Sequence, residues 1–196
     1  MLNIKELAEQ AYTISKSKGF YDPPLDIHQR GWLVICELAE ATEAERAGIA
    51  PADEAGFKIA TAQKDSDFAS AYRTHIKGSF EEEIADACIR LLDWLGWLLD
   101  EGRRQANPWM TPAGAHADIT NTTSLDSVSS SNFFLCVGEF VAYIIEDEAH
   151  MTVCLHHLIS AIEYHNQHTW KIDLKWHIEQ KMAYNATRPH RHGKKY

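Results

Sequence analysis

The chain has 196 residues, of which 45% are hydrophobic and 24% charged, and its formal net charge is −9. This composition is ordinary for one globular domain with a sizeable core, so we expect residues 1–196 to form a single domain. The acidic balance argues against general nucleic-acid binding, and no apolar run approaches the ~20 residues of a membrane span. The first ten residues also lack an apolar signal core, which favours a cytoplasmic protein without a nucleic-acid or membrane partner.

Helical periodicity dominates the first part of the chain. One helix is predicted over residues 3–17, and Gly19 is placed to end it. Asp26 is the expected N-cap of a second helix, with a glutamine three residues later in the capping-box position, and Gly48 follows its end near residue 46.

The residues of the next segment, 49–78, leave two interpretations open. Pro51 and Gly56 favour a loop. Three other residues are instead spaced for one short amphipathic helix: Phe68, Tyr72 and Ile76.

A third long helix is predicted to open with a capping box, Ser79 and Glu82, and to reach about residue 101. Residues 103–131 contain two prolines and many Ser and Thr residues, so we expect a long loop. Three more helices are predicted, near 132–147, 150–167 and 170–186. The predicted fold is therefore an all-α helical bundle of about six helices, with two long loops or insertions.

Two pairs of acidic residues lie on these helices at three-residue spacing, Glu37 with Glu40 and Glu83 with Asp86. This spacing places both members of a pair on one helix face. Two such helices packed together would gather four carboxylates, which suits a hard divalent cation. Glu37 lies mid-helix among apolar neighbours, and a buried carboxylate needs a positive group nearby.

The candidate ligands are all oxygens, which favours magnesium, manganese or calcium over zinc or copper. A di-iron bundle would need Glu-x-x-His on two helices, and the chain contains no such motif. The helix dipole alone explains acids in a first turn, as at 81–83, but it does not explain Glu37. Structural ion pairing is the remaining alternative for the set.

The last 16 residues contain five Lys or Arg and no acid, and we define residues 187–196 as the basic tail. Lys181, Asn185 and Arg188 lie at 0, +4 and +7, on one face of a helix that Pro189 should end. Lysine and arginine bind phosphate oxygens, and asparagine suits the edge of a base or sugar. A solvated chain end is the plain alternative.

The motifs ELAE (Glu37 to Glu40) and EIAD (Glu83 to Asp86) together resemble the ExxE…ExxD signature of the MazG-like all-α nucleoside triphosphate pyrophosphohydrolases. That superfamily also includes the all-α dUTPases. The ending KMAYNATRPHRHGKKY is similar to the Lys-x-x-Tyr-Asn-x-Thr-Arg-Pro ending common among MazG-like proteins. The resemblance covers residues 25–47, 79–101 and 175–196. The gap between Glu40 and Glu83 is longer than in the compact members of that family, so the resemblance implies that residues 48–78 are an insertion.

The resemblance implies magnesium-dependent hydrolysis of deoxy or non-canonical nucleoside triphosphates to the monophosphate and pyrophosphate, for control of nucleotide pools. It implies catalytic, magnesium-binding carboxylates at Glu37, Glu40, Glu83 and Asp86. It implies substrate binding by Lys181, Tyr184, Asn185 and Arg188, although Tyr184 suits packing as well as base stacking. A carboxylate would orient the attacking water: Glu40, Glu43 or Glu82. A homodimer or homotetramer is also implied. The alternative function is a non-catalytic helical interaction module, with an acidic cluster and a basic tail.

A few further residues could be functional or structural. Glu139 lies among apolar helical neighbours and is either a further site residue or the buried partner of an arginine. Trp109 could stack on a base, whereas His165 and His168 are expected to be core or surface residues rather than metal ligands. The four cysteines are expected to be reduced core thiols: Cys36, Cys88, Cys136 and Cys154.

Overall fold

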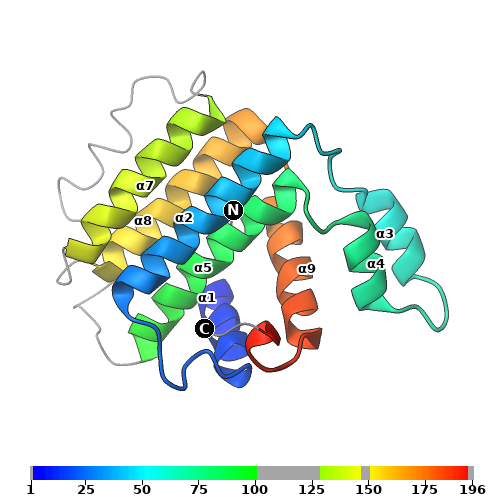
Figure 1. Ribbon diagram of the computed structural model, residues 1–196, viewed down its shortest axis with the longest axis horizontal. Coiled ribbons are helices and arrows are strands. Elements are labelled where there is room, and N and C mark those ends of the chain that lie inside the picture. Colours follow the sequence, from blue (N-terminus) through cyan, green and yellow to red (C-terminus); the bar gives the residue numbers. More distant parts are fainter. Residues whose placement is uncertain (1, 101–128, 147–150, 194–196) are drawn as a thin grey trace.

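The computed structural model describes residues 2–100, 129–146 and 151–193 (Figure 1). Within these ranges all regular elements are helical, so the predicted all-α fold is confirmed, with eight α-helices rather than about six. The helices are α1 (Ile4–Ser17), α2 (Ile27–Arg46), α3 (Glu54–Thr61), α4 (Phe68–His75), α5 (Phe80–Asp100), α7 (Ser130–Glu146), α8 (Met151–His165) and α9 (Leu174–Thr187). A π-helical turn, η2 (Asn166–Trp170), and a short 3-10 turn, η3 (His190–Gly193), complete them.

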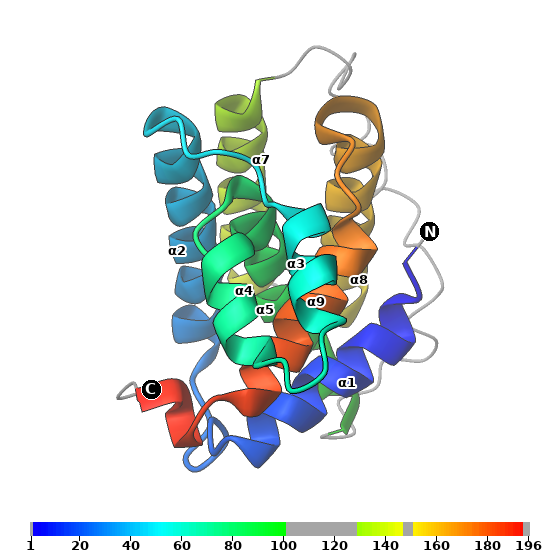
Figure 2. The same ribbon diagram turned by 90° about the vertical axis from the view of Figure 1, so that its right-hand side faces the viewer.

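Four of these helices form a closed bundle. Helix α2 packs against α5, α5 against α8, α8 against α7, and α7 against α2. Figure 1 shows these four side by side, and Figure 2 shows α1 crossing one end of them. Helices α1 and α9 also pack on α5, so α5 lies at the centre of the fold.

Helix α5 is central because most of its side chains are apolar and buried. Leu91, Leu92, Trp94 and Leu95 are each at most 1% exposed. Burial of one such side chain contributes about 1.5–3 kcal/mol, so this helix accounts for much of the core. No helix in the described ranges combines the length and the hydropathy that crossing a membrane would require.

The predicted helix caps are present, with one difference. Asp26 and Gln29 form the full capping box of α2. At the start of α5 the hydroxyl of Ser79 accepts a hydrogen bond from the Glu82 amide at 3.2 Å, as predicted. The Glu82 carboxylate, however, accepts from the amide of Gly78 instead of returning to Ser79.

Helices α3 and α4 form a small second core beside α9, on one side of the bundle (Figures 1 and 2). Phe57 of α3 contacts Trp176 of α9 edge to face, with ring centroids 5.7 Å apart. Tyr72 of α4 stacks on Tyr184 of α9, with centroids 4.4 Å apart. The segment that we expected to be an insertion is therefore packed against the end of the chain.

The short helix predicted around Phe68 and Tyr72 matches α4, but the expected loop around Gly56 is wrong because α3 forms there. A Cβ at Gly56 would lie 2.1 Å from Asp53 Oδ2 and 2.7 Å from His75 Nδ1. Asp53 caps α3 by accepting a hydrogen bond from the Gly56 amide. Glycine here makes room for that cap and for the histidine, rather than ending a helix.

Helix α7 corrects two expectations. Glu139 and Cys136 are both exposed, so neither lies in a buried stripe, although Cys88 and Cys154 are buried as expected. The helix packs through another set of apolar residues: Phe133, Phe134, Val137, Val141 and Ile144. Both faces of α7 carry apolar residues, so periodicity did not distinguish the outer face from the inner one.

His165 is fully buried and stacks on Phe133 with centroids 4.0 Å apart, whereas His168 is exposed. Their different surroundings agree with core and surface roles. Trp109 and residues 103–128 of the expected loop lie outside the described residues.

We predict that Gly96→Ala destabilises the protein because α1 crosses α5 at this glycine. A Cβ there would lie 2.3 Å from the Ala8 carbonyl oxygen and 2.7 Å from Tyr12 Cβ. Such overpacking costs about 1–3 kcal/mol, and each kcal/mol lowers the melting temperature by about 2–4 °C in a chain of this size. Thermal unfolding measures the effect. The matched control is Gly138→Ala in α7, where a Cβ meets nothing within 4 Å and should not lower stability.

Candidate metal and phosphate site

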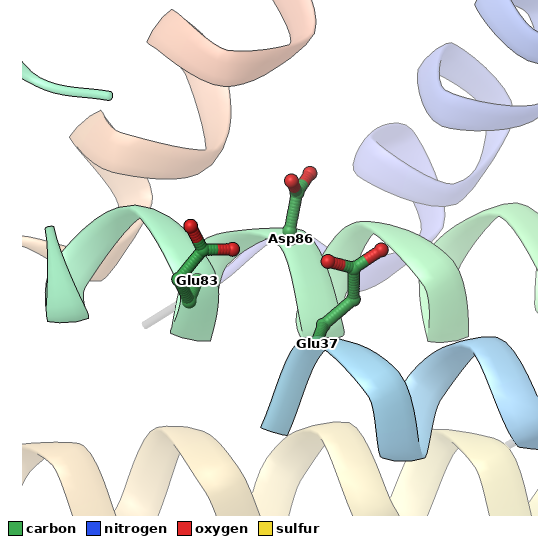
Figure 3. Close-up of side chains that lie close together, drawn as sticks. All are labelled: Glu37, Glu83 and Asp86. Atoms are coloured by element: carbon green, nitrogen blue, oxygen red, sulfur yellow. The ribbon is translucent and has the colours of Figure 1, made fainter. Parts of the chain in front are cut away.

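Three of the four predicted metal ligands lie together. Glu37 comes from α2, and Glu83 and Asp86 come from the first two turns of α5. Figure 3 shows their side chains directed to the same side of the two packed helices. One carboxylate oxygen of each lies within 4.8 Å of the other two. We call these three residues the carboxylate cluster.

The fourth predicted ligand, Glu40, lies outside this group. It is exposed, one turn beyond Glu37 on α2, and lines the adjoining pocket. Of the other acids considered for orienting water, Glu82 lines the pocket and is buried. Glu43 is exposed and pairs with Arg46 on the surface of α2, away from the pocket.

A pocket of about 190 Å³ adjoins the carboxylate cluster. It brings together the acids of α2 and α5 and the predicted basic face of α9. Five acidic and four basic side chains line it, with Ile89, Asn185 and His192: Glu37, Glu40, Glu82, Glu83, Asp86, Lys77, Arg90, Lys181 and Arg188. Residues separated by more than 140 positions in the chain therefore share one cavity.

Lys181 joins α9 to the start of α5. Its side chain is 6% exposed, and its ammonium group contacts Asp86 Oδ2 at 2.5 Å and a carboxylate oxygen of Glu82. Glu82 is itself 1% exposed and also accepts hydrogen bonds from the Tyr72 hydroxyl, at 3.3 Å, and from the Gly78 amide. Every acceptor oxygen of Glu82 is thus occupied, so this carboxylate holds Lys181 in place.

A guanidinium group compensates Glu37, as its burial required. Arg90 approaches Glu37 Oε1 with Nη2 at 2.8 Å and Nε at 2.9 Å. Two N–H donors on one carboxylate oxygen form a strong, charge-assisted contact. Within the described part of the chain, no salt bridge reaches the third member of the cluster, Glu83.

The electrostatics of the cluster favour a bound cation. Burial, with Glu82 and Asp86 nearby, raises the pKa of Glu83 to about 8. Burial and Asp86 also raise the pKa of Glu37, although Arg90 opposes the shift. Burial lowers the pKa of Lys181, but Asp86 and Glu82 outweigh it, so this pKa is raised and Lys181 stays charged.

The donor set fits a hard divalent cation. Three carboxylate oxygens from two packed helices meet at one place, and one of them belongs to Glu83, which forms no salt bridge with any described residue. Oxygen donors suit magnesium and manganese, which keep several waters and share themselves with phosphate oxygens. Glu37, Glu83 and Asp86 would hold such an ion, with Glu40 near enough to reach the same pocket.

The predicted substrate-binding residues divide into two groups. Lys181, Asn185 and Arg188 all line the pocket. Tyr184 is buried against Tyr72 and is not part of the lining, so its packing role is the one observed. Helix α9 ends at Thr187, close to the predicted end near residue 186, because Arg188 precedes a proline and adopts an extended conformation.

Three ionisable lining residues were not predicted: Lys77, Arg90 and His192. Arg90 carried a signal, since it lies four residues after Asp86 and therefore on the same helix face. Lys77 precedes the N-cap of α5, and nothing in the sequence indicated that it would reach the pocket. Burial, with Arg188 and Arg90 nearby, lowers the pKa of His192 to about 4, so it is neutral at pH 7.

Comparisons with models of protein families, with curated protein sequences and with solved structures found no match to this chain.

We predict that the metal-free protein loses stability as the pH rises from about 4.5 to 8, and that Glu83→Gln reduces the loss. In this window Glu83 keeps its proton in the folded state and loses it in the unfolded state, because its folded pKa is about 8. The unfolded state then binds fewer protons, so the free energy of unfolding falls with pH. The glutamine variant has no such proton.

Thermal unfolding in the presence of a chelator, at pH 5 and pH 8, measures this difference. The variant should gain stability relative to the unmodified protein as the pH rises. At pH 8, magnesium should restore the lost stability of the unmodified protein but should not stabilise the variant in the same way. Parallel pH profiles for the two proteins would contradict the burial of an uncompensated Glu83.

Proposed function

We propose that this protein is a magnesium-dependent nucleoside triphosphate pyrophosphohydrolase that releases pyrophosphate from deoxy or non-canonical nucleotides. The observation that carries the proposal is the pocket in which the carboxylate cluster faces Lys181, Asn185 and Arg188. Acids suited to a metal and cations suited to phosphates are the two requirements of phosphoryl transfer. The motif resemblance to MazG-like proteins supports the same reaction.

In this proposal each group of residues has a distinct task. The carboxylate cluster holds magnesium, which supplies positive charge to polarise the phosphate oxygens. Arg188 offers a planar set of N–H donors to phosphate oxygens, and Asn185 offers one donor and one acceptor. Glu40, exposed at the pocket and outside the close cluster, is the acid best placed to orient a water molecule.

The pocket volume limits what binds inside it. At about 190 Å³ it is smaller than the roughly 300–1,000 Å³ of typical small-molecule sites. It therefore suits the phosphates and the metal, and the base would lie against residues outside it. A second copy of the chain is one source of such residues, since the resemblance implies a homodimer or homotetramer.

A non-catalytic interaction module is the second candidate, and one observation favours it. Glu37 is paired with Arg90 and Asp86 with Lys181 inside the chain, so two of the three cluster acids need no ligand for their compensation. Glu83 is the exception, and the proposal is therefore tested at this residue.

We predict that Glu83→Gln strongly reduces pyrophosphate release while the protein remains folded. The substitution keeps the shape of the side chain and removes one anionic metal ligand. Loss of a group that stabilises the transition state electrostatically lowers turnover about 10²–10³-fold. Pyrophosphate release is measured on a panel of canonical and non-canonical nucleoside triphosphates, with magnesium and with a chelator, and circular dichroism checks the fold.

The matched control is Glu45→Gln, which changes an exposed glutamate at the far end of α2 and should leave turnover unchanged. Absence of turnover for every nucleotide by the folded, unmodified protein would favour the interaction module. Turnover in Glu83→Gln equal to that of the unmodified protein would show that the metal ligands are assigned to the wrong residues.

A further inference from the structure

Lys181 lies between the two halves of the proposed site. Its ammonium group contacts two carboxylates, and these differ in their other partners. Glu82 lies outside the carboxylate cluster, and the Tyr72 hydroxyl and the Gly78 amide also donate hydrogen bonds to it. Asp86 is shared, because it also belongs to the carboxylate cluster.

This sharing creates a competition at Asp86. A divalent cation in the cluster and the Lys181 ammonium would both be attracted to this carboxylate and would repel each other. The repulsion is strong because Lys181 is buried and little screened by solvent. A metal ion that binds alone must therefore overcome a positive charge that is already in contact with one of its ligands.

A phosphate would relieve the competition. An ammonium group has three N–H donors, and Glu82 and Asp86 accept two of them. The third is left for a phosphate oxygen in the pocket that Lys181 lines together with Asn185 and Arg188. An anion at this position neutralises the ammonium and so weakens its opposition to the metal.

We propose that Lys181 is a positioning residue that couples the two ligands: it weakens binding of the divalent cation alone and strengthens it when a polyphosphate is bound. This inference rests on the proposed assignment of metal and phosphates to the pocket, but it does not require turnover. Because coupling is reciprocal, the cation must strengthen polyphosphate binding by the same factor.

The charges of the pocket are consistent with this coupling. Its lining carries five acids and four bases, so with His192 neutral the empty pocket has a net charge of about −1 when every acid is ionised and about 0 while Glu83 keeps its proton. Such a pocket attracts neither a cation nor a polyanion strongly by itself. The positive charge of the metal and the negative charge of the polyphosphate largely cancel, so binding of both leaves the net charge of the pocket nearly unchanged.

The test uses manganese and pyrophosphate as probes. The dissociation constant of Mn²⁺ is measured by electron paramagnetic resonance, with and without pyrophosphate, after correction for the manganese–pyrophosphate complex in solution. For the unmodified protein, pyrophosphate should tighten Mn²⁺ binding by a factor in the range of about 5–150. Direct contact between metal and phosphate also contributes to this factor, so the decisive comparison is with a variant.

We predict that Lys181→Gln binds Mn²⁺ alone more tightly than the unmodified protein does. We also predict that the factor by which pyrophosphate tightens Mn²⁺ binding is smaller in this variant, by about threefold or more. Isothermal titration of pyrophosphate, with and without Mn²⁺, should give the same coupling factor. The matched control is Lys175→Gln, which changes an exposed lysine of the same helix that pairs with Glu179. It should change neither the dissociation constant of Mn²⁺ nor the coupling factor.

Lys181→Gln leaves Glu82 buried without its cation, so a second variant guards against misfolding. The double variant Glu82→Gln with Lys181→Gln removes both charges of the pair and should show the same two effects. The inference is overturned if the two variants bind Mn²⁺ no more tightly than the unmodified protein and pyrophosphate tightens their Mn²⁺ binding by the same factor as before. A protein that shows the coupling but hydrolyses no nucleotide overturns the proposed function alone.

Discussion

A single buried ammonium group joins the last long helix to the central helix of the bundle. Lys181 of α9 reaches Glu82 and Asp86 on α5, and Glu82 extends the connection to Tyr72 of α4. Removal of one partner from a buried pair costs about 3–5 kcal/mol, a large part of the 5–15 kcal/mol that stabilises a typical domain. Lys181 therefore contributes strongly to the position of α9 and to the shape of the pocket, alongside the apolar residues that α9 buries in the core.

Much of the fold and of the pocket could be predicted from local rules. Capping residues and glycines marked the helix ends, and spacing placed Lys181 and Asn185 on one helix face, with Arg188 just beyond the helix end in the same pocket. The apolar neighbours of Glu37 correctly indicated that it is buried and needs a positive partner. These features depend on residues within one or two helical turns, which the sequence displays directly.

The features that were missed depend on contacts between distant segments. Arg90 was visible as a neighbour of Asp86, but only the packing of α2 on α5 makes it the partner of Glu37. Glu40 shares a face with Glu37, yet the bundle leaves it exposed one turn further along. On α7 the error was similar, because an apolar face was expected to be buried and Glu139 lies on the side that no described helix covers.

Because of the small core of α3 and α4, the chain cannot be shortened in this segment without affecting the pocket. Its aromatic residues cover Trp176 and Tyr184, and Tyr72 provides a hydroxyl donor to Glu82. A shortened chain without residues 49–77 would uncover two large rings on α9 and leave a buried carboxylate short of a donor. It would also lose Lys77 from the pocket wall. The segment therefore covers α9 and supports the pocket. A protein with the same pocket but without this segment would need other residues to shield that helix.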